Sequence, residues 1–217
     1  DALRAEIRDY LLENPEVIME AVAVLEERQA AGQAAADVEL VRANADALFE
    51  APGDWVGGNP EGDITLVEFM DYRCSYCRRA ASEVQGLLAD DGNIRFVLKE
   101  FPILGEESVA ASRFALATKQ VAGDEAYKLV HDALMSYSGT MNEAGFTRLA
   151  DALGLDANAI VAEMDSDAVT EIIAANHALA QRLRINGTPA FVMDEQMLRG
   201  YLPQDQMQAI ADEIRTN

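Results

Sequence analysis

The pair Cys74 and Cys77 constrains this chain most, because these are its only cysteines and they lie where a strand is expected to become a helix. Residues 64–69 are apolar and β-branched, as strands are, whereas residues 78–89 repeat at helical spacing. At a helix start, unpaired backbone N–H groups and the helix dipole favour the thiolate of the first cysteine, which is its reactive form. The second sulfur lies on nearly the same helical face, where it can attack a mixed disulfide formed by the first.

Two other interpretations of the cysteine pair are a zinc half-site and a purely structural disulfide. Zinc needs four ligands, and the only histidines, His131 and His177, fall inside helical patterns without metal spacing. A disulfide that closes so small a ring constrains the unfolded chain little. We therefore favour a redox-active pair, with no metal and no cofactor beyond the Cys74–Cys77 disulfide itself.

The composition limits the partners that this chain can have. It carries 38 acidic and 17 basic side chains, a net charge of −21, and a chain this acidic repels nucleic acid and anionic membrane surfaces. The acids are scattered through the expected helices, which favours a solvated surface over a binding tail. No run of about 20 apolar residues could span a membrane. No signal peptide is visible, so we expect a chain that was cut before Asp1 or that never had a leader.

Residues 1–50 are expected to form a helical extension. Apolar residues recur there at helical spacing, with a helix start at Asn14-Pro15-Glu16 and a helix end near Gly32. Apolar stripes this narrow cannot form a core alone. We expect the extension to be an oligomerisation segment that pairs with copies of itself, with docking on its own chain as the alternative.

Residues 51–217 are expected to form the second unit, after a Gly- and Pro-rich boundary at residues 51–60. The unit has an α/β pattern: a mixed sheet flanked by helices, with an all-helical insertion at about residues 105–186. The elements expected are strands at 64–69 and 93–101, helix starts at Asn142 and Asp156, a hairpin of strands 190–193 and 196–201 turning at Asp194-Glu195, and a last helix at 203–214.

Three features resemble the DsbA-like thiol–disulfide oxidoreductases of the thioredoxin superfamily. They are the Cys74-Ser75-Tyr76-Cys77 motif after the first long strand, the Gly187-Thr188-Pro189-Ala190-Phe191 loop, and the helical block between them. The resemblance covers about residues 55–217 and implies a thioredoxin fold. The segment Tyr10-Leu-Leu-Glu-Asn-Pro-Glu-Val-Ile18, with Lys99-Glu-Phe-Pro-Ile-Leu-Gly105, is similar to the ScsC-like branch, whose extension serves oligomerisation.

The resemblance implies that Cys74 is the nucleophile and Cys77 the buried resolving thiol. Ser75 and Tyr76, in the turn between them, are expected to contact substrate. DsbA has Pro-His at these two positions, so this chain lacks the positive side chain that lies between the sulfurs there. The flanking Arg73, Arg78 and Arg79 are candidates to supply part of that charge.

The resemblance also makes Pro189 a cis-proline that faces the cysteines. Thr188 would then offer its carbonyl and amide to a substrate strand, and it could hydrogen-bond a cysteine sulfur. The alternative for Thr188 is an ordinary β-branched residue before a proline.

Glu68 lies six residues before Cys74 inside an apolar strand, where a carboxylate is costly unless it is paired or protonated. It matches the family's buried acid, which would take a proton from the resolving cysteine as a general base. Lys99 matches the partner lysine of that acid. The alternative is a solvent-facing Glu–Lys pair across neighbouring strands.

The sequence thus predicts an enzyme that acts on cysteines of unfolded or misfolded proteins in the periplasm, where a membrane thiol–disulfide protein would be its redox partner. The extension, the Thr before the proline and the missing His favour an isomerase or reductase over an oxidase. The alternatives are a chaperone-like or outer-membrane-associated binding protein with incidental cysteines, and a glutathione-dependent enzyme. The intact cysteine pair speaks against the last of these.

Overall fold

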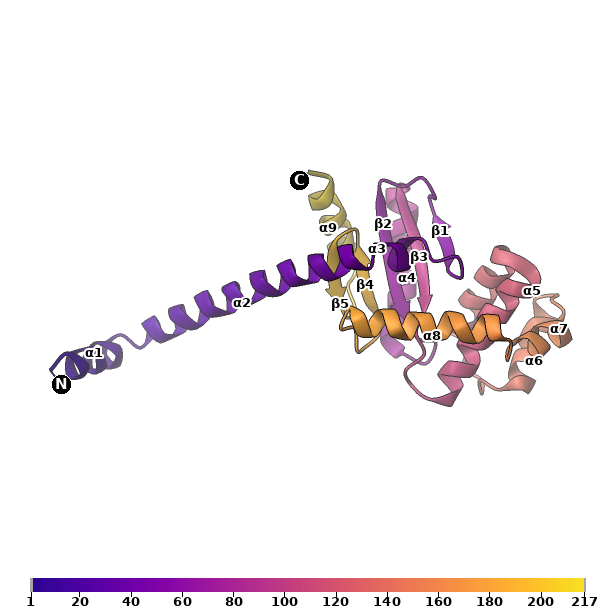
Figure 1. Cartoon of the computed structure of the whole chain (residues 1–217), viewed down its shortest axis with the longest axis horizontal. Coiled ribbons are helices and arrows are strands. Elements are labelled where there is room, and N and C mark those ends of the chain that lie inside the picture. The colour runs from indigo at the N-terminus through magenta and orange to yellow at the C-terminus, as the bar shows by residue number, and fades with distance from the viewer. Residues whose placement is uncertain (1, 217) are drawn as a thin grey trace.

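The computed structural model describes residues 2–216, and it shows a globular body from which one long helix projects (Figure 1). The helices are α1 (Ala2–Glu13), α2 (Glu16–Ala43), α3 (Ala45–Phe49), α4 (Ser75–Asp91), α5 (Glu106–Ser136), α6 (Glu143–Ala152), α7 (Ala157–Glu163), α8 (Asp167–Arg182) and α9 (Gln204–Thr216). The strands are β1 (Trp55–Gly58), β2 (Ile64–Met70), β3 (Ile94–Glu100), β4 (Ala190–Met193) and β5 (Gln196–Arg199).

The five strands form one mixed sheet in the order β1-β3-β2-β4-β5. β2 and β3 are parallel and are joined through α4, as a βαβ unit requires, while the other neighbours are antiparallel. The hairpin of β4 and β5 is confirmed, with Asp194 in the left-handed region at φ 48° in its turn. β1 was missed because its four residues lie inside the Gly- and Pro-rich segment that we interpreted as a boundary.

Each face of the sheet has its own core. The face that carries Leu66, Met70 and Phe96 packs against α4, α5 and α9. The opposite face carries Val67, Phe69 and Val97 and packs against α3, α8 and the last turns of α2. Adjacent residues along β2 and β3 therefore enter different cores, because side chains alternate across a strand.

Two helices of the insertion begin where their capping residues predict. Asn142 caps α6 by accepting a hydrogen bond from the Gly145 N–H at 3.0 Å, and Asp156 caps α7 through the Ala159 N–H at 3.0 Å. Within α5, Gly123 departs from helical geometry with φ 85°, a conformation that glycine adopts without a steric penalty.

The projecting helix α2 is continuous from Glu16 to Ala43, so the expected helix end near Gly32 is wrong. A glycine in a helix interior costs about 1 kcal/mol relative to alanine, which does not break an alanine-rich helix of 28 residues. Along α1 and α2 large apolar side chains are exposed: Leu3, Ile7, Tyr10, Leu12, Ile18, Met19, Val22, Val24 and Leu25.

The last turns of α2 are docked on the globular body of the same chain. Val41 is buried against the sheet, and the Asp37 carboxylate, only 5 % exposed, accepts two hydrogen bonds from the Arg199 guanidinium at 2.6 and 2.9 Å. Arg42 makes a second two-pronged contact, with Glu195, at 2.7 and 2.8 Å. On the body, the donor Arg199 lies in β5 and the acceptor Glu195 lies directly before it, so the helix is attached at this edge of the sheet.

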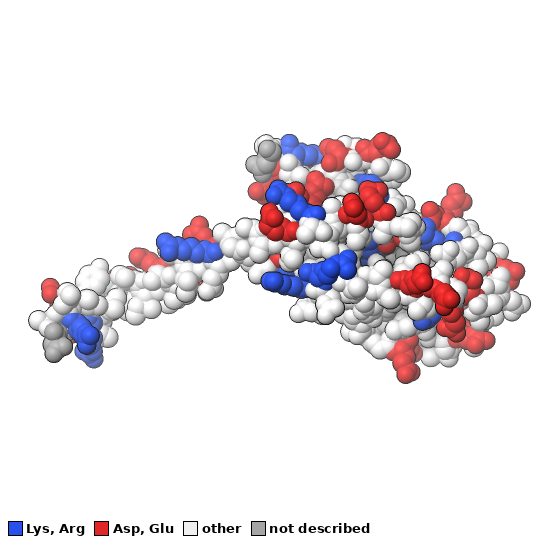
Figure 2. Space-filling model, in the orientation of Figure 1, with Lys and Arg blue, Asp and Glu red and all other residues white. Residues whose placement is uncertain are grey.

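Figure 2 shows acidic and basic side chains on both the globular body and the projecting helix. Within residues 2–216, no helix combines the length and the apolar character needed to cross a membrane.

Candidate active site around Cys74 and Cys77

Cys74 occupies the N-cap of α4, directly after the loop that follows β2. Its backbone is extended, at φ −73° and ψ 117°, and its carbonyl accepts a hydrogen bond from the Arg78 N–H at 3.1 Å. The sulfur is therefore held at the end of the helix where N–H groups lack helical partners. Cys77 lies one turn further and is completely buried, while Cys74 is slightly exposed, and both are free thiols.

Asp71 holds this loop in place, although sequence reasoning did not single it out. Its side chain is fully buried and accepts hydrogen bonds from the Arg73, Ile103 and Leu104 N–H groups at 2.7 to 3.0 Å and from the Ser108 hydroxyl at 2.8 Å. It thereby joins the loop before α4 to the loop after β3. A short acid directly after a buried strand was the available signal.

The loop before β4 lies against the cysteines. The Thr188–Pro189 peptide bond is cis, and the Cys74 thiol donates a hydrogen bond to the Thr188 carbonyl at 3.2 Å. Pro189 is buried and Thr188 is half-buried. Beside this loop lies a hollow of about 260 Å³, lined by residues 185–190 together with Arg199 and Gly200.

An exposed surface lies next to Cys74. Ser75 is exposed, and Tyr76 is 58 % exposed with its ring 6.4 Å from that of Tyr201. The Arg79 guanidinium lies over the Tyr201 ring, 4.5 Å from its centroid. These side chains form an aromatic and cationic surface beside the reactive sulfur.

The three arginines around the motif have other partners. Arg73 forms an ion pair with Glu107 at 3.2 Å, Arg78 donates to the Tyr72 and Tyr137 carbonyls at 2.8 Å each, and Arg79 lies over the Tyr201 ring. None of these contacts is with a cysteine of the motif.

Glu68 is buried on the α4 side of the sheet, with 3 % of its surface exposed, and its Oε1 has no hydrogen-bond partner. Burial raises the pKa of its carboxyl to about 8. Burial also raises the pKa of the Cys77 thiol, and the charge of Glu68 raises it further. The Glu68 carboxyl is therefore mostly protonated at neutral pH, and it lies close enough to Cys77 for its charge, when it ionises, to affect that thiol.

The expected partnership of Glu68 and Lys99 is wrong. The register of β2 and β3 sets Glu68 opposite Leu98 and Phe69 opposite Lys99, so the two charged residues lie on opposite faces of the sheet. Lys99 is fully buried, and its Nζ forms an ion pair with Asp54 and donates to the Ala47 carbonyl. Burial raises the pKa of Asp54 to about 6, and Lys99 opposes that rise.

Glu100, at the end of β3, was also missed. It is buried, and its carboxylate accepts hydrogen bonds from the Tyr72, Tyr127 and Ser112 hydroxyls at 2.7 to 2.8 Å. Burial raises its pKa to about 7 despite these donors.

His131 is buried with these groups rather than being an ordinary polar residue on a helix surface. Its Nδ1 lies 3.1 Å from the Tyr72 hydroxyl, and burial lowers its pKa to about 4. Among the residues that the structure describes, no three His, Cys, Asp or Glu side chains converge as a metal site would require.

A free thiol at a helix N-terminus, a second thiol one turn on, and a cis-proline loop against them on a mixed sheet define a thiol–disulfide protein with the thioredoxin fold. The sequence comparisons agree with this class. Residues 65–212 match the DSBA-like thioredoxin domain, and residues 1–31 match the copper resistance protein ScsC N-terminal domain. The chain belongs to the DSBA-like thioredoxin family of thiol–disulfide oxidoreductases, whose redox group is the cysteine pair itself.

Solved structures support the same assignment. A thioredoxin-like oxidoreductase from Silicibacter pomeroyi is 48 % identical, with a TM-score of 0.74 over 79 % of this chain and 98 % of that one. Proteus mirabilis ScsC, in a transitional conformation, is 27 % identical, with a TM-score of 0.72 over 97 % of this chain and 94 % of that one. The likeness to ScsC thus includes the projecting helices.

A curated relative matches this chain over only a small part of its own length. Na(+)/H(+) antiporter NhaA 1 of Salinispora arenicola is 30 % identical over 142 residues, which are 65 % of this chain and 22 % of the antiporter. The chain therefore spans about a fifth of the length of that protein.

Proposed function

We propose that this chain catalyses thiol–disulfide exchange on cysteine-containing unfolded or misfolded proteins, through a mixed disulfide at Cys74. One observation carries the proposal: the Cys74 thiol lies at the N-terminus of α4 and donates to the Thr188 carbonyl, beside cis-Pro189. A substrate sulfur that approaches Cys74 therefore meets a backbone segment with which an extended substrate can pair.

The exchange proceeds in two steps. The Cys74 thiolate attacks one sulfur of a substrate disulfide, so that a Cys74–substrate bond forms and the other substrate sulfur leaves as a thiolate. A different substrate thiolate then attacks the substrate sulfur of the mixed disulfide, which forms a new substrate disulfide and releases Cys74 as a thiolate, or Cys77 attacks the Cys74 sulfur. In the second case a Cys74–Cys77 disulfide forms and the substrate leaves reduced.

Glu68 exchanges the proton of Cys77 in this proposal. Burial disfavours the Cys77 thiolate, so attack by this sulfur requires a nearby base. Glu68 has an unpaired carboxylate oxygen and a pKa of about 8, which suits proton exchange near neutral pH. Lys99 has no part in this step, because it lies on the other face of the sheet.

We favour isomerase or reductase activity over oxidase activity. The support is the absence of a cationic side chain between the sulfurs, together with the threonine before the cis-proline and the projecting helices. Titration of the Cys74–Cys77 pair against glutathione buffers tests this preference, and we expect a reduction potential near that of glutathione or below it. A potential as oxidising as that of DsbA, about −120 mV, would contradict it.

We also propose that α1 and α2 associate with copies of themselves and that the protein works in the periplasm with a membrane redox partner. The exposed apolar side chains on both helices support association, since such a stripe is stabilised by a partner helix. A solved relative from Salmonella enterica, 26 % identical, is described as a periplasmic thioredoxin-like protein. Light scattering of the full chain and of a chain lacking residues 1–36 should give different multiples of the protomer mass.

The catalytic assignment is tested by refolding a substrate with scrambled disulfides. We expect Cys74→Ala to abolish the activity, because no mixed disulfide can form. Cys77→Ala should retain isomerisation and accumulate mixed disulfides that a gel without reductant reveals. Undiminished refolding by Cys74→Ala would remove the proposed function.

The second candidate is a binding protein that holds unfolded chains on the exposed apolar stripe of α1 and α2, with incidental cysteines. The same exposed residues favour it. Suppression of aggregation that survives Cys74→Ala but not removal of residues 1–36, with no refolding of the scrambled substrate, would support this candidate.

A further inference from the structure

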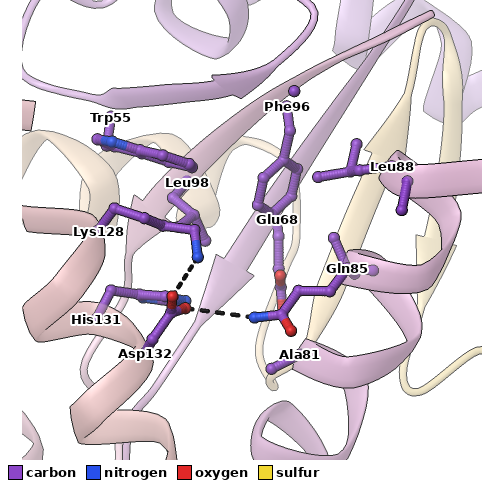
Figure 3. Close-up of a pocket in the computed structure, with 13 residues that line it drawn as sticks. Trp55, Glu68, Ala81, Gln85, Leu88, Phe96, Leu98, Lys128, His131 and Asp132 are labelled. Carbon is purple, nitrogen blue, oxygen red and sulfur yellow. Dashed lines mark hydrogen bonds and ion pairs between the residues drawn. The ribbon is translucent and has the colours of Figure 1, made fainter. Parts of the chain in front are cut away.

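A cavity of about 330 Å³ lies on the α4 side of the sheet, away from the hollow beside the cis-proline loop (Figure 3). Its walls are the apolar side chains of Trp55, Val84, Leu88, Phe96 and Leu98. Cavities of 300 Å³ or more with mostly apolar walls and a few convergent polar groups are typical of small-molecule sites. The volume is about twice that of a 150 Å³ cavity that holds benzene, so one or two rings fit.

Two buried polar groups line this cavity, the carboxyl of Glu68 and the imidazole of His131. The Glu68 carboxyl is 3 % exposed, and its Oε1 has no hydrogen-bond partner among the described residues, whereas His131 Nδ1 is paired with the Tyr72 hydroxyl. Figure 3 shows this carboxyl lying between side chains of α4, on the side of Gln85 and Ala81, and side chains of α5, on the side of His131 and Asp132. A buried polar atom without a partner is rare in native proteins and calls for an explanation.

The cavity opens between α4 and α5, where three polar side chains lie across its mouth. Gln85 donates to Asp132 at 3.3 Å, and Lys128 forms an ion pair with the same carboxylate. Gln85 is exposed and Lys128 and Asp132 are half-buried, so these contacts exchange readily with water. The mouth therefore presents no packed barrier to a small molecule.

We propose that this cavity binds a small uncharged molecule that has an aromatic body and one primary amide, with the amide on Glu68. A protonated carboxyl presents an O–H donor beside a carbonyl acceptor, and a primary amide presents the matching acceptor and donor. An uncharged head is favoured, because an ion in this apolar cavity would lose its hydration. The aromatic body would lie against the rings of Trp55 and Phe96, which line the cavity and pack edge to face on each other with centroids 6.3 Å apart.

The groups that surround Glu68 are consistent with a neutral ligand. Cys77 lies on the α4 side, and on the α5 side are His131, whose low pKa keeps it neutral, and the mutually paired Lys128 and Asp132. β3 contributes only apolar side chains to the cavity, Phe96 and Leu98. No net charge therefore faces Glu68 to recruit an ionic ligand.

Trp55 is the only tryptophan of the chain, so its fluorescence reports directly on the cavity. We would titrate the full chain with benzamide, with toluene as the probe without a polar head and with benzoate as the charged probe. We expect benzamide to saturate, toluene to bind about tenfold more weakly because it leaves the carboxyl unpaired, and benzoate not to bind. Equal binding of toluene and benzamide would overturn the assignment of Glu68.

Two variants and one control complete the test. Ala81→Phe fills the cavity and should abolish benzamide binding, while Ala122→Phe, on an exposed part of α5 outside the cavity, should leave it unchanged. Should Ala81→Phe not fold, Glu68→Leu serves instead, and it should weaken benzamide about tenfold while toluene still binds. Absence of saturable binding to the wild type, or binding that survives Ala81→Phe, would overturn the proposal. Since these readouts need no thiol chemistry, they fail independently of the proposed function.

Discussion

Glu68 and Glu100 lie on the same face of the sheet, one on β2 and the other at the end of β3, yet their surroundings are opposite. Both are buried, and burial raises both pKa values, to about 8 for Glu68 and about 7 for Glu100. Glu100 accepts hydrogen bonds from three hydroxyls, whereas Glu68 has an oxygen to which none of the described residues donates a hydrogen bond.

Glu100 is a structural carboxyl that links secondary-structure elements, whereas Glu68 has an unpaired oxygen that is free to react. The donors to Glu100 come from the loop after β2 and from α5, so this acid connects them to β3. A carboxyl with its donors in place contributes to stability, while an unpaired one costs about 1–3 kcal/mol. The unpaired acid is the one that lies near Cys77 and in the cavity, where a free oxygen can exchange a proton or bind a ligand.

The largest expected effect concerns the pH dependence of stability in Glu68→Gln. The folded wild type keeps the Glu68 proton up to a pKa of about 8, whereas the unfolded chain loses it near 4.5. The native state therefore binds more protons in between, and wild-type stability falls as the pH rises from about 4.5 to 8 and then levels. Glutamine cannot ionise, so the variant should gain about 3–5 kcal/mol on the wild type between pH 4 and pH 9.

Urea denaturation at several pH values measures this gain. Glu68→Asp is the matched control, because it retains a carboxyl and should retain most of the slope. Parallel stability curves for the wild type and Glu68→Gln would show that Glu68 is not the unpaired acid that the comparison makes it.

Glu100→Gln should give the next largest effect, with the opposite sign. Its amide group donates where the carboxylate accepted, so at least one hydroxyl loses its acceptor and meets another donor. We expect a loss of about 2–3 kcal/mol at pH 7, measured by urea denaturation. A stability equal to that of the wild type would mean that the three hydroxyls bind Glu100 without net benefit.

Tyr127→Phe removes one of the donors and should cost about 1 kcal/mol, the usual net value of a hydrogen bond. Tyr72 donates to the same oxygen, so the two losses should not be additive. A double-mutant cycle with Tyr72→Phe measures the coupling, and strict additivity would contradict a shared acceptor.

Gln85→Ala should have the smallest effect, within about 0.5 kcal/mol. Its side chain is exposed and makes a single hydrogen bond of 3.3 Å at the mouth of the cavity. A thermal unfolding scan is sufficient to measure it. A large loss of stability would show that the Gln85–Asp132 contact at the mouth of the cavity is structural.

Local pattern was sufficient to predict the cysteine pair. Cys74 and Cys77 follow a recognisable strand and precede a recognisable helix, and this spacing places two thiols at a helix start. The position of Thr188 and Pro189 against the cysteines was predicted from the family resemblance, because cis bonds are a small minority of X-Pro bonds and nothing in the local pattern indicates one.

The partners of the buried charges could not be predicted in this way. Glu68 and Lys99 fall on different faces because of the register between β2 and β3, and a shift of one residue reverses the face of every side chain. Glu100 and His131 both hydrogen-bond to the Tyr72 hydroxyl, and His131 reaches it only after α5 has packed on the sheet. The sequence pattern of a single segment determines neither the strand register nor this packing.

Because only the last turns of α2 are docked, a small rotation of the helix at the docking site displaces its far end by a much larger distance. From Glu16 to Asp37 the helix rises about 1.5 Å per residue, so the free part is roughly 30 Å long. A tilt of about 10° at the Asp37–Arg199 contact carries the far end through roughly 5 Å, while β5 itself moves by a small fraction of that distance. Arg199 also lines the hollow beside the cis-proline. A force on the far end of α2 would therefore reach the rim of that hollow through the Asp37–Arg199 contact, amplified by the length of the helix.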